Sequence, residues 1–263
     1  EKIKSIFMHI NISYKKYLYY LKLLKFKTNL LIPDNSIEFI ISHYNENFEY
    51  LKFLPINQKI TIYIKGSPKI ILPNTKHNKI EFINLENIGK EYHTYLFHII
   101  KNYYNLSKIN FFITASFLGI KERTRNFTKV YKKVASLNKK KFNGLYTSDD
   151  KLFLLKYDKK KFLDPKMRIF EHTTSQGIKH KMIASKIYPL ENYFDYYFKN
   201  KTLDKQIKSL NGIFATDKEN IKSIDLSVYK NIIKEYTIPG KDYESGHYLE
   251  RIYPSIFKLN HED

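Results

Sequence analysis

Short, dense apolar runs alternate along this chain with stretches of helical periodicity. The runs Ile37–His43, Ile60–Ile64 and Ile109–Ala115 have the pattern of buried strands, and Ile80–Leu85 is a further candidate. Between them, Lys90–Tyr104 repeats its apolar residues at the spacing of one helix face. Strands that alternate with helices favour a mainly parallel sheet covered by helices on both faces. The pattern therefore predicts an α/β fold.

The region before the first strand is expected to form a separate unit. Residues 1–34 hold an apolar and aromatic stretch from Tyr14 to Leu31 among lysines, and the break Pro33-Asp34-Asn35-Ser36 follows. Such a stretch is compatible with a helix on the core, a helix on a membrane surface, or a lead-in from another domain. We expect a helical extension or linker over 1–34 and a single domain over 35–263. Further helices are predicted at Thr124–Val134, Tyr188–Lys199, Leu226–Tyr236 and His247–Phe257, and a strand at Leu152–Leu155.

The chain is strongly basic, with 46 lysine and arginine residues against 26 aspartate and glutamate residues and a net charge of +20. A surface this positive attracts anionic lipid headgroups and other polyanions. One alternative function is a nucleic-acid-binding module, in which basic residues cluster on one face with aromatic residues between them. The lysines are instead spread along the whole sequence, and arginine, which is preferred for reading bases, is scarce. We therefore expect no nucleic-acid partner.

The sequence excludes several classes of site. It contains no cysteine, which excludes disulfides, iron–sulfur clusters, cysteine-ligated zinc and thiol catalysis. It also lacks a Walker P-loop, a GxGxxG turn, a GxSxG elbow and an HExxH motif. No run approaches the roughly 18–20 apolar residues of a membrane span, and the first residues lack the features of a signal peptide. We expect a cytoplasmic protein whose basic surface is suited to contact the inner face of the membrane.

Polar residues follow the first two predicted strands. His43, Tyr44, Asn45 and Glu46 come at the end of the first strand, where open α/β sheets bind ligands, and Lys65 ends the second. The alternative for the first group is a helix start, in which Asn45 is the cap and Glu46 complements the helix dipole.

A second polar segment precedes and begins the long predicted helix. Gly89 can supply a tight turn after Asn87, and Glu91 and His93 lie in the first helical turn. Glu91 has a structural interpretation as a residue that complements the helix dipole. His93 is off the apolar face, so it points either into a cleft or into solvent.

A third segment lies near the carboxyl end. Glu250 and Arg251 interrupt an otherwise apolar helix, which places Glu250 near a half-buried wall. A carboxyl group in such a place has a raised pKa and can serve as a general base. The alternative is a salt bridge between Glu250 and a nearby basic side chain.

Five segments follow one another in the order IEFIISHYNE, ITIYIKGS, NIGKEYHTYLFHIIKNYYNLSKINFFITAS, GIFATDKENI and HYLERIYPSIF. This order resembles that of a domain-of-unknown-function family associated with glycosyltransferase-like proteins of bacterial surface polysaccharides. The likeness covers residues 37–258 and is strongest at 86–113.

The resemblance implies a GT-A-like, Rossmann-like fold that takes a nucleotide-sugar donor, with a UDP-sugar favoured. It implies a glycan or lipid-linked acceptor and a role in capsule or other surface polysaccharide synthesis. The implied donor-binding residues are His43, Tyr44, Asn45, Glu46, Lys65, Asn87 and Gly89; the implied catalytic residues are Glu250, Glu91 and His93; the implied acceptor-side residues are Gly246, His247 and Arg251. A further alternative is a non-catalytic accessory domain of a larger transferase.

The resemblance leaves metal dependence open. GT-A enzymes usually hold Mn²⁺ or Mg²⁺ through an acidic motif after an internal strand, because the leaving diphosphate needs its charge neutralised. The strand best placed for it ends Phe112-Ile113-Thr114-Ala115-Ser116, without a carboxylate. The pair Asp149-Asp150 is either a displaced metal motif or a turn. The alternative is metal-independent catalysis, with Arg123 and Arg125 as candidates to neutralise the diphosphate unless they occupy a solvated helix face.

Overall fold

The computed structural model describes residues 37–67, 70–74, 76–77, 79–135, 145–147, 171–173, 179–203 and 212–257. Its elements are β1 Ile37–His43, η1 Phe48–Phe53, β2 Lys59–Ile64, β3 Ile80–Asn84, α2 Lys90–Asn102, β4 Ile109–Thr114, η2 Ala115–Leu118, α3 Lys121–Ala135, β5 Leu145–Thr147, β6 Glu171–Thr173, β7 Lys179–Lys181, α6 Leu190–Tyr197, β8 Phe214–Asp217, α7 Lys218–Lys222, α8 Leu226–Ile233 and α9 Glu244–Ile256. The extension over 1–34, the strand at Leu152–Leu155 and the Asp149-Asp150 pair lie outside the described residues.

Six strands form one sheet in the order β3-β2-β1-β4-β8-β5, and β6 and β7 form a separate ribbon. β3, β2, β1 and β4 are parallel, and the register pairs Ile40 of β1 with Thr61 on one side and Phe112 on the other. β8 is antiparallel to β4, and β5 is antiparallel to β8. The prediction of an α/β fold with a mainly parallel sheet is confirmed, and the arrangement is compatible with a Rossmann-like fold. The antiparallel strand β8 was not predicted.

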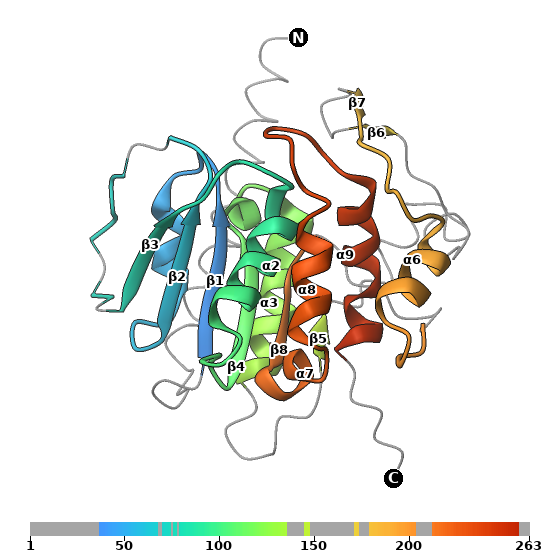
Figure 1. Ribbon diagram of the computed structural model, residues 1–263. Helices are drawn as coiled ribbons and strands as arrows, with labels where there is room; N and C mark the ends of the chain where they lie inside the picture. The colour runs from blue at the N-terminus through green and yellow to red at the C-terminus, as the bar shows by residue number, and fades with distance from the viewer. Residues whose placement is uncertain are drawn as a thin grey trace.

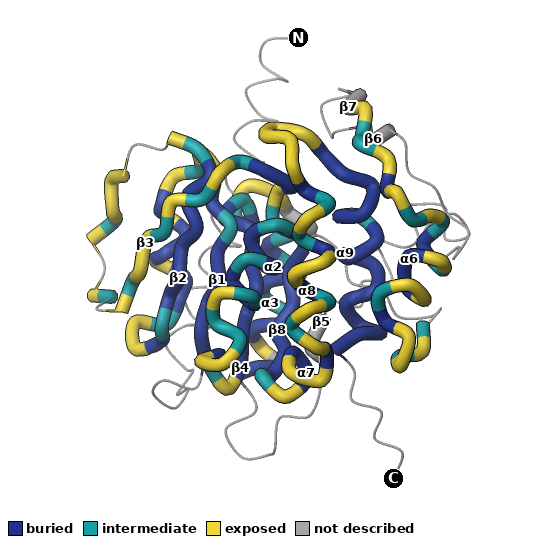
Figure 2. Tube along the Cα trace, in the orientation of Figure 1, coloured by how far each residue is buried: buried dark blue, intermediate teal, exposed yellow. Residues whose placement is uncertain are grey.

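Two apolar cores lie on opposite faces of the sheet, because successive strand residues point to opposite sides. Ile40, Phe112 and Phe214 pack against α2, α6, α8 and α9. Phe39 and Phe111 pack against η1, η2 and α3 on the other face. Figure 1 shows α2, α8 and α9 side by side over one face of the sheet. In Figure 2 the central strands are dark blue, whereas the edge strand β3 is largely exposed.

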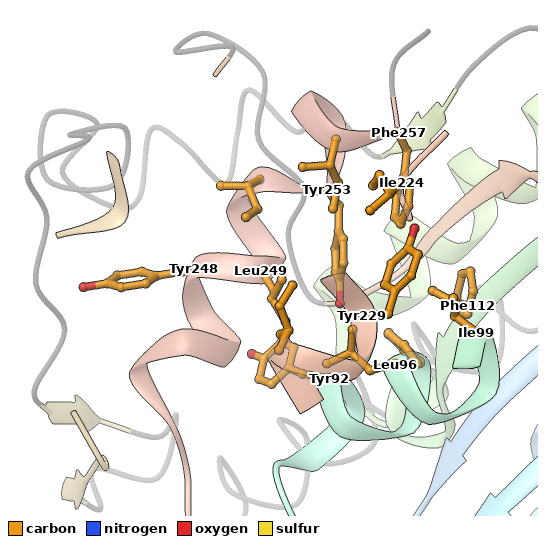
Figure 3. Packing of buried hydrophobic residues seen from close by; sticks show 14 of the residues in the cluster. Tyr92, Leu96, Ile99, Phe112, Ile224, Tyr229, Tyr248, Leu249, Tyr253 and Phe257 are labelled. Carbon is orange, nitrogen blue, oxygen red and sulfur yellow. The ribbon is translucent and has the colours of Figure 1, made fainter. Parts of the chain in front are cut away.

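Helix α9 approaches α2 very closely at Gly246. A Cβ atom at this position would lie 2.2 Å from a ring carbon of Tyr92, which no real contact allows. The glycine therefore lets the Tyr92 ring of α2 pack directly against the backbone of α9. Figure 3 shows the result, with Tyr92 and Leu96 of α2 beside Leu249 of α9. None of the described helices combines the length and apolar character needed to cross a bilayer.

Candidate functional site

A polar cleft of about 470 Å³ opens at the carboxyl ends of β1, β2 and β4. It is lined by Ser42, Tyr44, Glu46, Lys65, Asn87, Lys90, Glu91, Thr114, Ser116, Arg123, Gly240 and Lys241. The chain leaves β1 toward β2 on one side, whereas β4 lies on the other side of β1. This reversal of strand order is the topological switch point at which open α/β sheets bind ligands.

Lys65 lies at the end of β2 with only 6% of its surface exposed. Its ammonium group donates hydrogen bonds to the backbone carbonyls of Ile88 and Lys90. Burial lowers the pKa of Lys65 to about 7, although the nearby Glu91 carboxylate opposes this shift. The side chain thus joins the end of β2 to the start of α2 and brings a titratable cation into the cleft.

A left-handed turn at Gly89 and Lys90 starts α2. The φ angles are +57° at Gly89 and +47° at Lys90, and a Cβ on Gly89 would lie 2.7 Å from the ring of Tyr236. The prediction of a tight turn at Gly89 is therefore confirmed, and the close approach gives a second reason for glycine. The turn directs Glu91 into the cleft, and its side chain lies close to Gly212, since a Cβ atom on that glycine would be 3.1 Å from Cγ of Glu91.

Arg123, in the first turn of α3, forms the opposite wall of the cleft. Its guanidinium donates hydrogen bonds to the side-chain hydroxyls of Thr114, at 3.4 Å, and of Ser116. Among the described residues, no carboxylate lies within 4.0 Å of this guanidinium. Arg125, the other arginine proposed as a diphosphate ligand, does not line the cleft.

A chain of charged side chains runs from the cleft into α9. The Lys90 ammonium lies 2.5 Å from a carboxylate oxygen of Asp242, and His247 Nε2 lies 3.3 Å from the same oxygen. His247 Nδ1 is 3.9 Å from Glu250, which is also 3.8 Å from Arg251. Although burial opposes ionisation, the hydrogen bond from His247 and the charge of Lys90 hold the pKa of Asp242 well below its usual range.

Five of the predicted donor-binding or catalytic residues line the cleft, namely Tyr44, Glu46, Lys65, Asn87 and Glu91. The backbone amide of Tyr44 donates a 2.8 Å hydrogen bond to the Glu46 carboxylate, which holds that side chain over the end of β1. Asn45 lies beside the cleft and accepts a 3.2 Å hydrogen bond from the amide of Ser67. The loops after β1 and β2 are thereby joined at the rim.

His43 and His93 do not line the cleft. The His43 ring is fully buried, stacks on Phe48 at 4.4 Å and hydrogen-bonds Tyr50 at 2.9 Å. His93 packs against the rings of Phe97 and Tyr236. Burial, aided by the charge of Lys65, lowers the pKa of His93 to about 4, so its imidazole is neutral at pH 7.

The four predicted residues of α9 stand behind the cleft rather than in its lining. Gly246 serves the contact with Tyr92, and Glu250 lies between His247 and Arg251. Arg251 also donates a 2.7 Å hydrogen bond to the backbone carbonyl of His247. The alternative interpretation of Glu250, a salt bridge with a basic neighbour, matches this geometry.

Several cleft residues were not predicted. Ser42 is the residue before His43 in β1, and successive strand residues point to opposite faces of the sheet. This alternation could have predicted that Ser42, rather than His43, faces the cleft. Gly240 and Lys241 have no local signal, because they reach the cleft through pairing of Ile88 with Pro239 and a 2.7 Å hydrogen bond from Gly240 to the Asn87 carbonyl.

The charges of the described cleft residues favour an anion over a divalent metal. Its two carboxylates, Glu46 and Glu91, share the lining with four basic side chains. Within the described ranges, no three His, Cys, Asp or Glu residues gather as a ligand set. Hard cations such as Mg²⁺ and Mn²⁺ take several oxygen ligands and are repelled by lysine and arginine.

The chain is an α/β protein with a mainly parallel sheet and a polar cleft at the switch point of that sheet. The chain belongs to the family described as "Protein of unknown function (DUF3431)", whose profile matches residues 39–263. The expected membership of a domain-of-unknown-function family is thereby confirmed. No curated protein and no solved structure matches the chain.

Proposed function

We propose that this protein is a GT-A-type glycosyltransferase that moves a sugar from a nucleotide-sugar donor, in the first place a UDP-sugar, to a glycan or lipid-linked acceptor. The observation that carries the proposal is the cleft at the switch point, where the Glu91 carboxylate shares the lining with four basic side chains. This combination supplies a proton acceptor beside groups that attract an anionic donor.

The proposed reaction assigns the base to Glu91. The acceptor hydroxyl oxygen attacks the anomeric carbon of the donor, and its proton passes to the Glu91 carboxylate. The bond between the anomeric carbon and the diphosphate oxygen breaks as the new glycosidic bond forms, and the nucleotide leaves with the electron pair. Glu91 is the one residue of the three predicted catalytic residues that lines the cleft; His93 and Glu250 lie outside it.

The remaining cleft residues support the same ligand. Tyr44 is 50% exposed at the rim, so its ring offers an aromatic face on which a nucleobase can stack. The strongly basic chain would hold the protein near an anionic membrane, where lipid-linked acceptors of surface polysaccharide synthesis lie.

The experiment is a nucleotide-release assay with UDP-, GDP-, CMP- and dTDP-sugars, in the presence and absence of glycan acceptors. We expect turnover with one nucleotide class and a loss of about 100-fold or more in Glu91→Gln, as for removal of a general base. Glu81→Gln, the same change on the exposed face of β3, is the control and should retain full rate. No turnover with any donor, or full turnover in Glu91→Gln, would contradict the proposal.

A further inference from the structure

The cleft has two cationic walls that face each other across β1. Lys65 stands at the end of β2, and Arg123 is joined to the end of β4 through Thr114 and Ser116. β2 and β4 are the two neighbours of β1. Adjacent strands lie about 4.8 Å apart, so these strand ends are separated by about 10 Å. An anion with two charged ends can therefore contact both walls at once.

In the described chain neither cation has a carboxylate within 4.0 Å, although the charge of Glu91 acts on Lys65 from farther away. Lys90 is paired with Asp242, whereas Lys65 donates to two carbonyl groups and Arg123 to two hydroxyl groups. Neutral acceptors leave both cations without an ion pair, and such charges in a half-enclosed cleft favour an anionic ligand. The hydroxyls of Thr114 and Ser116 hold the guanidinium fork in place, which favours two parallel bonds to a phosphate.

We infer that the cleft binds a diphosphate group between Arg123 and Lys65, and that these side chains neutralise it in place of a divalent metal. This inference rests on the proposed function for the origin of the diphosphate. The group belongs either to the nucleotide of the donor or to a lipid diphosphate acceptor. Both sources present the same chemistry to the two cations, so the experiment separates them.

The test measures binding by isothermal titration calorimetry in EDTA and again in Mn²⁺. The ligands are inorganic pyrophosphate, UDP and geranyl diphosphate. We expect binding in EDTA with no more than a twofold change on adding Mn²⁺. Tighter binding of UDP than of pyrophosphate would assign the site to the donor, and tighter binding of geranyl diphosphate would assign it to a lipid acceptor. No binding of any ligand in EDTA overturns the inference.

Variants identify the groups that hold the diphosphate. Arg123→Gln and Lys65→Met should each raise the Kd by about 10- to 100-fold, the effect of losing a charge-assisted hydrogen bond. Lys132→Gln removes one positive charge from an exposed position on the same helix as Arg123 and should leave the Kd unchanged. If Lys65→Met does not fold, Arg123→Gln still decides, since Arg123 borders the open cleft. An unchanged Kd in Arg123→Gln overturns the inference.

A last variant and the transfer assay separate this inference from the proposed function. Asp149→Asn combined with Asp150→Asn should leave the Kd for the diphosphate unchanged. A tenfold rise in the Kd would indicate that a metal held by those carboxylates neutralises the diphosphate. Sugar transfer that accompanies strictly Mn²⁺-dependent diphosphate binding would overturn the inference and leave the proposed function standing. Metal-free diphosphate binding without transfer of any sugar would support the inference and contradict the proposed function.

Discussion

The two ends of the same strands hold polar clusters of different character. At the amino end of β1, Glu38 is 1% exposed and lies on the face that packs against α2. One carboxylate oxygen accepts a 2.7 Å hydrogen bond from Thr61 and lies 3.0 Å from the Lys59 ammonium; the other accepts a 2.9 Å hydrogen bond from Ser107. At the carboxyl end, Lys65 and Arg123 border an open cleft.

The difference lies in how the charges are compensated. The buried carboxylate at the amino end is matched by a cation and two hydroxyl donors, and His98 lies 4.0 Å away. At the carboxyl end, Lys65 and Arg123 donate hydrogen bonds only to neutral oxygens. Buried charges are costly unless they are paired, so a matched cluster stabilises the fold, whereas an unmatched one beside open volume indicates a ligand. Substitutions at the two ends should therefore separate stability from binding.

The largest effect on stability is expected from Glu38→Gln. The change removes the charge that Lys59 and two hydroxyl donors compensate, so the free energy of unfolding should fall by about 3 kcal/mol. Urea denaturation measures the loss, with the exposed Glu81→Gln as the control. Binding of UDP by the folded fraction should be unchanged. A loss of stability no greater than that of the control would contradict the structural role of this cluster.

Acid should weaken the amino-end cluster next. Burial lowers the pKa of His98 to about 4 against the opposing charge of Glu38. The pKa of Glu38 is also lowered, because His98, Thr61 and Lys59 together outweigh its burial. The unfolded chain therefore binds more protons as pH falls below about 6.5, and stability is lost from there toward pH 4.

Urea denaturation at pH 7 and pH 4.5 measures this loss. We expect about 2 to 3 kcal/mol from His98 and a similar amount from His93, whose pKa is also lowered to about 4. Glu38→Gln should show a weaker dependence at the acid end of this range, since it lacks the lowered pKa of the Glu38 carboxyl group. Equal stability of the wild-type protein at the two pH values would show that His98 is not held neutral.

The carboxyl-end cluster should make the protein more stable as the pH rises above 7. Lys65 titrates at about 7 in the folded protein and at its ordinary value near 10.5 when unfolded. Between pH 7 and 10.5 the Lys65 amine is protonated in the unfolded chain but neutral in the folded protein. The free energy of unfolding should therefore rise by about 1.4 kcal/mol per pH unit from pH 7.5 to 9. Lys65→Met should abolish the rise. A slope that persists in this variant would assign it to another group.

The smallest effect on stability is expected from Arg123→Gln. The guanidinium has hydroxyl acceptors rather than a carboxylate, and Gln can still donate to Thr114 or Ser116. The free energy of unfolding should change by about 0.5 kcal/mol or less. A loss as large as that in Glu38→Gln would show that Arg123 belongs to the fold and would remove the contrast between the two ends.

Most of the fold was predictable from the sequence, because β1, β2, β4 and α2 have clear periodicity and the predicted boundaries agree to within a few residues. β8 was missed because its four residues, FATD, are too short and too polar for a strand signal. Its pairing with β4 is a tertiary effect.

The cleft was only partly predictable. The residues directly after β1 and β2 were expected there, and Tyr44 and Lys65 line it. His43 was assigned to the same side, although the two-residue period of β1 turns it to the other face. Lys241 and Asp242 could not be placed, since the pairing of Ile88 with Pro239 brings them to the cleft, and Asp242 lies 152 residues along the chain from its partner Lys90.

The contact between Gly246 and Tyr92 has a consequence for related sequences. A side chain on α9 and a ring on α2 cannot occupy the same space, so the two positions are under a joint steric limit. In an alignment of the family, replacement of the glycine by a larger residue should coincide with a smaller residue in place of the tyrosine. Covariation between positions 92 and 246 would thus indicate that these two helices, which are far apart in the sequence, are in contact.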